Sequence, residues 1–258
     1  MEDYVSYKDI PSLWKLKKGD VIYISSDITR LASVCHDNGE LFDINIFIDK
    51  IIDAVGENGT VLFPTFNWDF CHQVPFNYKK TKSKSGLMGH VAMKRRDFKR
   101  TRHPLYSFAV AGKDQDLLYN MDNIQSFGPD SPFAYLERTK GYNIIIDVPY
   151  SKCFTFKHYV EQKIGVPYRY EKMFTGEYID ENGNTSIRSY SMYVRDMDLD
   201  VDNDMTGMGN IFEAEGVSRK RIINGIPFCK VDLASCVPLI EHDIKFNRSK
   251  NICKYKNQ

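Results

Sequence analysis

The sequence lacks any apolar run long enough to cross a membrane. Its longest apolar stretches, such as residues 21–26 and 144–148, fall far short of the roughly 20 residues that a spanning helix needs. The first residues, Met-Glu-Asp, are acidic and show neither the basic nor the apolar region of a signal peptide. We therefore expect a cytoplasmic protein without a membrane partner.

A charge imbalance is also missing. Lys and Arg number 35 against 34 Asp and Glu, so the formal net charge is only +1. No field of the whole molecule then attracts nucleic acid, and we expect no nucleic-acid partner. Recognition must come from a local site.

Paired cysteines are absent as well. The six cysteines are scattered without a CxxC motif, which fits reduced thiols better than a disulfide framework or a zinc site, so no metal is predicted. They are Cys35, Cys71, Cys153, Cys229, Cys236 and Cys253.

The 258 residues, 42% of them hydrophobic, suffice for one large domain, which we place at residues 1–258. The character of the sequence changes in the C-terminal part, 170–258. Its last segment, 245–258, is polar and basic and is expected to fray. The apolar pattern is the same for a monomer and a dimer, so it predicts no oligomeric state.

Hydrophobic patterning indicates an α/β protein. An apolar strand at 20–24, a helical period over 41–55 and a strand at 60–64 form a βαβ order, which favours a sheet with parallel neighbours. Further buried strands are expected at 108–111 and 143–148.

The C-terminal part has a different pattern. Asn-Gly stands between two strand-like runs at 177–185, which predicts an antiparallel hairpin. The strongly acidic segment 196–204 is typical of a solvated loop, although a cation site there is the alternative. It lacks the Gly and the terminal Glu of a calcium loop.

The most informative segment is 155–161. If it opens a helix, Thr155, His158 and Glu161 share one face, because they are three residues apart. An imidazole with an unperturbed pKa of about 6.5 can accept a proton near neutral pH, and a nearby carboxylate can orient it. The alternative is a capping Thr, a half-buried His and a surface Glu.

Three other segments have weaker signals. Residues 100–109 offer two arginines suited to phosphate oxygens, followed by a His-Pro turn. In 127–133, Ser131 is a candidate helix cap. Residues 25–29 place small hydroxyl side chains after the first strand, where backbone N–H groups can hold a phosphate.

Taken together and in order, these segments resemble the aminoglycoside 3-N-acetyltransferase family. The resemblance covers roughly residues 10 to 170. It rests on Gly19-Asp20 with Ser25-Ser26, on the run from Gly59 to Phe66, on Arg102-His103-Pro104 with Ser107-Phe108, on Gly128 with Ser131-Pro132, and on Thr155, His158 and Glu161.

This resemblance implies an α/β/α sandwich with a mixed central sheet and an antiparallel C-terminal hairpin region. It implies acetyl-CoA as co-substrate and direct transfer of the acetyl group to an amine. His158 is then the general base, Glu161 its partner and Thr155 a neighbour of the thioester carbonyl. The implied coenzyme site is lined by Ser25, Ser26, Arg102, His103, Ser107 and Phe108.

The acceptor is expected to be a small-molecule amine on an amino sugar. Asp147 stands where the family usually has a glycine, which indicates a reshaped acceptor pocket. An aminoglycoside, and with it antibiotic resistance, is one possibility. A nucleotide-linked amino sugar of surface-polysaccharide biosynthesis is another. The acidic segment 196–204 is a candidate lining of the acceptor site.

Two rival functions remain open from the sequence. One is a coenzyme A-binding protein that has lost turnover. The other is a hydrolase in which Cys153 or Ser151 acts as nucleophile with His158.

Overall fold

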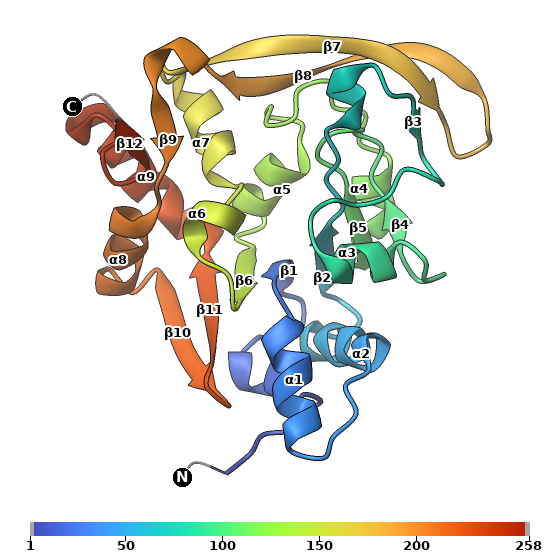
Figure 1. The fold of residues 1–258 in the computed structure, drawn as a ribbon, viewed down its shortest axis with the longest axis vertical. Helices are drawn as coiled ribbons and strands as arrows, with labels where there is room; N and C mark the ends of the chain where they lie inside the picture. Colours follow the sequence, from blue (N-terminus) through green and yellow to red (C-terminus); the bar gives the residue numbers. More distant parts are fainter. Residues whose placement is uncertain (1–2, 256–258) are drawn as a thin grey trace.

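A mixed seven-stranded sheet forms the centre of the computed structural model, which describes residues 3–255 (Figure 1). Its strand order is β10-β11-β6-β1-β2-β5-β4. The strands are β1 (Val21–Ser26), β2 (Thr60–Pro64), β4 (Lys99–Arg100), β5 (Phe108–Gly112), β6 (Tyr142–Ile146), β10 (Ser218–Ile223) and β11 (Ile226–Asp232).

The middle of this sheet is parallel and its edges are antiparallel. β1 pairs parallel with β2 and β6, as the βαβ order predicts. β5 pairs antiparallel with β2, and β11 with β6. The expected strands at 20–24, 60–64, 108–111 and 143–148 are therefore confirmed, with boundaries shifted by at most two residues.

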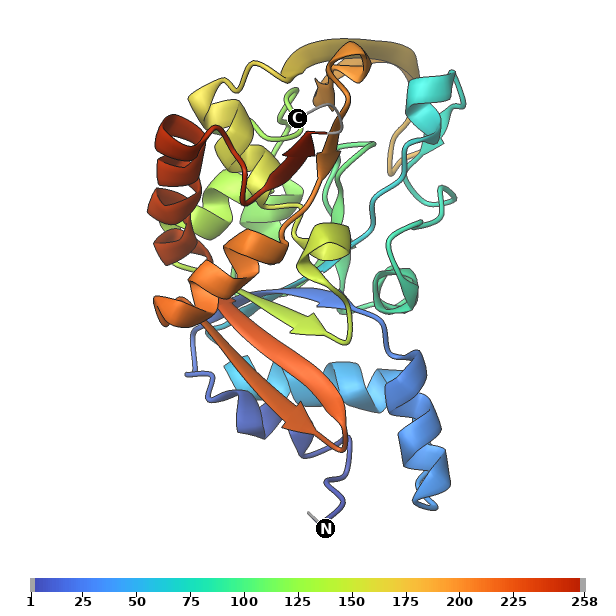
Figure 2. The same ribbon diagram turned by 60° about the vertical axis from the view of Figure 1, so that its left-hand side comes forward.

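Helices cover both faces of the sheet (Figure 2). Alternate residues of β1 divide between the two cores, because successive side chains of a strand point to opposite faces. One face packs against η1 (Ile10–Trp14), α1 (Thr29–Asp37), α2 (Ile44–Val55) and α3 (Leu87–Ala92). The other packs against α4 (Gln115–Tyr119), α5 (Pro132–Arg138), α7 (Lys157–Ile164), α8 (Thr206–Ala214) and α9 (Leu233–Asn247). This is the expected α/β/α sandwich.

The predicted Asn-Gly hairpin is present and long. It joins β7 (Arg169–Ile179) to β8 (Thr185–Arg195), with Gly183 at φ +87° in the turn. Asp180 Oδ1 accepts hydrogen bonds from the backbone N–H groups of Asn182 and Asn184, which fixes the turn. The hairpin crosses one end of the sheet in Figure 1 and carries β3 (Phe76–Asn77) on one edge, near η2 (Asp69–His72).

Two expectations for the C-terminal part are wrong. The segment 196–204 is not simply a loop, since it forms η3 (Met197–Leu199) and β9 (Val201–Asn203). The fraying expected from residue 245 does not occur up to residue 255, because α9 continues to Asn247 and β12 (Cys253–Tyr255) pairs with β9. The buried Asp243 carboxylate holds this turn by accepting hydrogen bonds from Asn247 and Asn251. Residues 256–258 lie outside the described residues.

None of the helices between residues 3 and 255 combines the length and the apolar character needed to cross a bilayer.

Candidate active site

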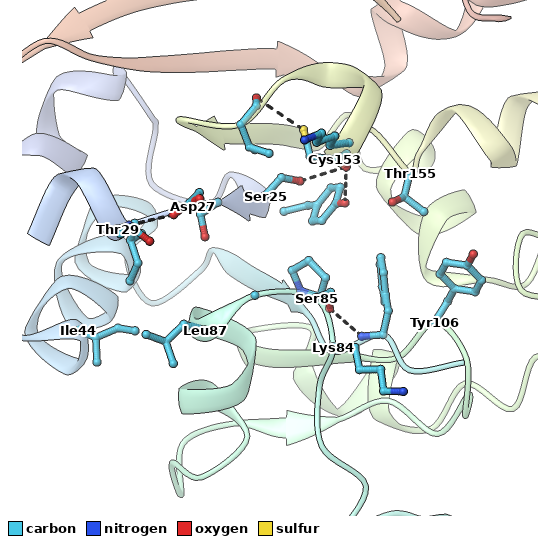
Figure 3. Close-up of a pocket in the computed structure, with 18 of the residues that line it drawn as sticks. Ser25, Asp27, Thr29, Ile44, Lys84, Ser85, Leu87, Tyr106, Cys153 and Thr155 are labelled. Atoms are coloured by element: carbon cyan, nitrogen blue, oxygen red, sulfur yellow. Dashed lines mark hydrogen bonds between the residues drawn. The ribbon is translucent and has the colours of Figure 1, made fainter. Parts of the chain in front are cut away.

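A cleft of about 830 Å³ opens where β1 ends, between the two helical layers. Figure 3 shows Ser25, Cys153 and Thr155 along one wall and Lys84, Ser85 and Leu87 along the opposite wall. The carboxyl ends of parallel strands, where the chain leaves the sheet, are the usual place for ligand sites in α/β folds.

His158 lines this cleft with its side chain 14% exposed. It sits in the first turn of α7, and its Nδ1 lies 2.6 Å from Glu161 Oε2. Glu161 is fully buried and lies one helical turn further on. An ionised carboxylate can only accept, so Nδ1 carries the proton and Nε2 remains as the acceptor.

The carboxylate of Glu161 is held by a buried charged cluster. Lys157 Nζ lies 3.7 Å from Oε1, and Arg169 Nε lies 2.8 Å from Oε2. Tyr168 donates a hydrogen bond of 3.1 Å to Oε1. Burial alone raises the pKa of Glu161, but the charges of Lys157 and Arg169 and the hydrogen bond from His158 outweigh burial and lower it, so Glu161 is ionised.

The environment of His158 favours the neutral ring. Burial lowers its pKa to about 4, and the charge of Arg169 acts in the same direction. Glu161 opposes this shift without cancelling it. At neutral pH the imidazole is therefore neutral and able to accept a proton through Nε2.

Thr155 lies in the cleft but not on the helix. α7 begins at Lys157, and Thr155 belongs to the turn before it, because its N–H donates to Cys153 O rather than entering the helix. The main chain still fixes its place, since the His158 N–H donates to Thr155 O at 3.0 Å. Its own backbone N–H is used, so only its hydroxyl is available to a ligand.

Ser25 and Ser26 line the cleft at the end of β1, as the resemblance implies. Ser25 Oγ lies 3.2 Å from Asn143 Oδ1 and 3.4 Å from Cys153 O, and its one proton is shared between these two acceptors, which ties β1 to β6 and to α6 (Tyr150–Cys153). The structure thus brings together Ser25, Ser26, Thr155 and His158, with Glu161 directly behind.

The other four residues expected at the coenzyme site do not line the cleft. Arg102 pairs with Glu181 of the hairpin at 2.8 Å and stacks on Tyr119. His103 is buried, and its Nδ1 accepts from the N–H groups of two following residues. Arg102 and His103 do lie in a turn before a strand, as the sequence predicts, but that turn faces the β7–β8 hairpin.

Ser107 and Phe108 are fully buried. Ser107 Oγ lies 2.9 Å from Thr65 Oγ1 and accepts from the Arg100 guanidinium, so it joins β5 to β2. Phe108 packs against the rings of Tyr23 and Phe66. Their contacts support the floor beneath the cleft.

Sequence reasoning missed most of the wall opposite His158. Its residues include Phe66, Trp68, Lys84, Ser85, Gly86 and Leu87. The run Lys-Ser-Lys-Ser-Gly before the α3 helix was the available signal, since such hydroxyl-rich and Gly-containing turns start helices at ligand sites.

Neither nucleophile of the hydrolase alternative is activated. Burial raises the pKa of the Cys153 thiol to about 12, which keeps it protonated at neutral pH. Ser151 is exposed on α6 and does not line the cleft.

The acidic segment 196–204 contributes no residue to the cleft. The lining instead carries one carboxylate, Asp27, and two lysines, Lys84 and Lys152. Asp27 accepts a hydrogen bond of 2.9 Å from the Thr29 N–H just before α1, which lowers the pKa of Asp27.

Comparison with known proteins agrees with this architecture. The chain is 24% identical to the SPbeta prophage-derived aminoglycoside N(3')-acetyltransferase-like protein YokD of Bacillus subtilis (strain 168), over 93% of this chain and 91% of that protein. The solved structure of YokD superposes with a TM-score of 0.76 at 21% identity, covering 98% of this chain and 97% of the other.

Two further solved structures share the fold. AAC-IIIb in a binary complex with CoASH has a TM-score of 0.74 at 18% identity, covering 92% of this chain and 94% of the other. AAC-VIa with bound sisomicin has a TM-score of 0.76 at 16% identity, covering 95% of this chain and 99% of the other. The family model described as aminoglycoside 3-N-acetyltransferase matches residues 24–243. The chain therefore belongs to the aminoglycoside 3-N-acetyltransferase family.

Proposed function

We propose that this chain transfers the acetyl group of acetyl-CoA directly to the amine of an amino sugar, with His158 as general base. The observation that carries the proposal is the position of His158 in the cleft. Its Nδ1 is engaged by the buried Glu161, and the ring is neutral with Nε2 free for the acceptor.

The cleft fits a coenzyme A thioester. Phe42, Leu87 and Val148 supply apolar walls for a pantetheine arm, while Lys152 supplies charge for phosphate groups. Lys84, on the opposite wall, is paired with Asp69. The CoASH bound to AAC-IIIb, which shares this fold, supports the same donor. Acetyl-CoA brings an activated acyl group, and the chain's residues then have to position the amine and manage its proton.

The proton steps follow from the geometry. The acceptor nitrogen has to lose a proton to attack the thioester carbonyl, and Nε2 of His158 accepts it directly or through one water. Glu161 stabilises the imidazolium that results. As the C–N bond forms, the C–S bond of the thioester breaks, and the leaving thiolate of coenzyme A takes the proton from the imidazolium. The Thr155 hydroxyl is the donor proposed for the negative charge that develops on the carbonyl oxygen, and such a donor typically lowers a barrier by about 3 kcal/mol.

The acceptor has two candidates. AAC-VIa was solved with sisomicin and a variant of AAC(3)-IVa with apramycin, which supports an aminoglycoside here. Lys84 is paired with Asp69, and Lys152 balances the single lining carboxylate of Asp27, so the cleft has no excess of negative charge for a polycationic acceptor. An amino sugar linked to a carrier such as a nucleotide is therefore the second candidate.

The test is a thiol-release assay with acetyl-CoA and three acceptor groups: aminoglycosides, free amino sugars and nucleotide-linked amino sugars. We expect release with at least one group. His158→Ala should reduce the rate about 10²- to 10⁴-fold, because a general base contributes that much. His36→Ala, at an exposed histidine on α1, is the matched control and should leave the rate unchanged.

Two outcomes would overturn the proposal. One is binding of coenzyme A without thiol release for any acceptor, which is the behaviour of an inactive CoA-binding protein. The other is release that His158→Ala leaves unchanged although circular dichroism shows a native fold.

A further inference from the structure

A second cavity, of about 370 Å³, lies between η1 and the β10–β11 hairpin. It shares no lining residue with the cleft that contains His158. Its apolar lining comes from Trp14, Ile144 and Phe228, which belong to the same hydrophobic core. The remaining lining is mostly cationic: Lys15, Arg219, Lys220, Arg221 and Lys230. We call this site the basic cavity.

The strand register gathers the cations on one side. Arg219 pairs with Lys230, and Arg221 pairs with Phe228. Residues directly opposite each other in an antiparallel pair project to the same face. Because Phe228 is buried against Trp14, the other three side chains project toward η1 as well.

Two of these cations are fixed by the backbone of η1. Arg221 Nη1 donates to Leu13 O at 2.9 Å, and Lys230 Nζ donates to Lys15 O at 3.0 Å. Each of these carbonyl groups accepts from only one N–H donor of Arg221 or Lys230. The other donors stay available, and the positive charge of both side chains is not neutralised. The basic cavity is therefore lined by positioned donors.

Carboxylates do not neutralise this charge. Within residues 3–255, neither Arg219 nor Arg221 forms an ion pair. The arginines that do are Arg30, Arg95, Arg102, Arg169, Arg188 and Arg195. Burial lowers the pKa of Lys230, and the neighbouring charges of Arg219, Lys17 and Lys15 lower it further. Only Asp20 opposes this effect.

We propose that the basic cavity binds a phosphate monoester with an apolar or ring-bearing body, of the mononucleotide class. Guanidinium groups match phosphate oxygens with paired donors. Trp14, Ile144 and Phe228 supply the apolar surface that a ligand body needs, and the volume lies in the range of small-molecule sites. This site is separate from the catalytic cleft and does not depend on the proposed acetyl transfer.

The experiment is a calorimetric titration of AMP into the protein without coenzyme A, because coenzyme A carries an adenosine phosphate monoester and would compete for the basic cavity; variants of the cavity then locate the AMP site. We expect one saturable AMP site. Adenosine, which lacks the phosphate, and inorganic phosphate, which lacks the ring-bearing body, should each bind at least about tenfold more weakly. Raising the salt concentration should weaken AMP binding.

The variants Arg219→Gln and Lys230→Gln should each weaken AMP binding about tenfold or more. Lys113→Gln removes an exposed lysine at the end of β5 and should leave it unchanged. Melting curves of each variant establish that it is folded.

Three results would overturn the inference. These are no saturable AMP binding, equal affinity for AMP and adenosine, or binding that neither variant weakens. A polyglutamate peptide that binds in place of AMP would also overturn it, since it would identify the surface as a protein-docking site.

Discussion

One oxygen atom, Oε2 of Glu161, connects the proposed base to the rest of the protein. It contacts both His158 Nδ1 at 2.6 Å and Arg169 Nε at 2.8 Å. Arg169 comes from β7, whereas the other two residues belong to α7. The hairpin therefore contributes to the electrostatic environment of the proposed base, although it does not itself line the cleft.

This arrangement predicts the pH dependence of kcat/KM. Below its pKa the imidazolium cannot accept a proton, so activity falls as pH decreases through that value. Because the pKa of His158 is lowered to about 4, its acid limb should lie well below the ordinary value of about 6.5. Arg169→Met removes a positive charge that lowers this pKa, so the limb should move to higher pH by roughly 1 unit.

Two further variants control this measurement. Arg169→Lys keeps the charge and should return the limb toward its original position. Arg188→Met, at an arginine of the same hairpin, should not move it. Deprotonation of the acceptor's own ammonium group also affects the pH profile, but this contribution is the same in the unmodified protein and in the three variants. An unchanged profile in Arg169→Met would show that Arg169 has no electrostatic role.

At this scale the sequence predicted what local spacing determines. Three-residue spacing placed His158 and Glu161 in contact. Lys157 lies four residues before Glu161, so helical spacing also indicates their ion pair. Spacing could not identify Arg169 as a partner of Glu161, or the hydrogen bond from Lys157 to Ile252 O, because both involve distant segments. Such contacts depend on tertiary packing, which spacing does not encode.

At the scale of elements, the wall opposite His158 depends on how closely α3 approaches β2. A Cβ at Gly89 would lie 2.0 Å from Pro64 O, so only glycine permits this contact. The first turn of α3 and the residues before it supply Gly86 and Leu87 to the cleft. The position of this wall therefore depends on the absence of a side chain at Gly89.

Gly89→Ala should displace α3 and enlarge or distort the cleft. We expect the KM for acetyl-CoA to rise several-fold and the free energy of unfolding to fall by roughly 1–3 kcal/mol, as for other overpacked sites. Steady-state kinetics and urea unfolding measure the two effects. His90→Ala, one residue further along α3, adds no atom against β2 and is the control. Equal behaviour of the two variants would contradict the packing argument.

Elements with strong local signals were predictable, and those without them were not. Ser131 caps α5 as expected, because its side chain accepts from the Ala134 N–H. The last strand, β12, was missed because a polar and basic stretch gives no strand pattern. It forms only because β9 provides a partner and Ile252 is buried beside it.

On the scale of the whole molecule, an N-terminal segment, η1, packs against a C-terminal one, the β10–β11 hairpin. The C-terminal β10–β11 hairpin extends the sheet begun by β1 (Figure 1). The basic cavity lies between this hairpin and the N-terminal η1. The part of the chain from Arg169 to residue 255 thus supplies one of the charges behind His158, Arg169 itself, and one edge of the central sheet. The pairing of this part of the chain with distant segments explains why the sequence alone indicated only one hairpin and a change of character there.

The most direct test of the account is the distance between His158 Nε2 and the acceptor nitrogen in a crystal structure with coenzyme A and the acceptor found in the thiol-release assay. We predict that the nitrogen lies within hydrogen-bond reach of Nε2, about 2.6–3.2 Å, or one water away. An acceptor bound elsewhere, with its nitrogen beyond the reach of one water from the ring, would contradict the assignment of His158 as the base.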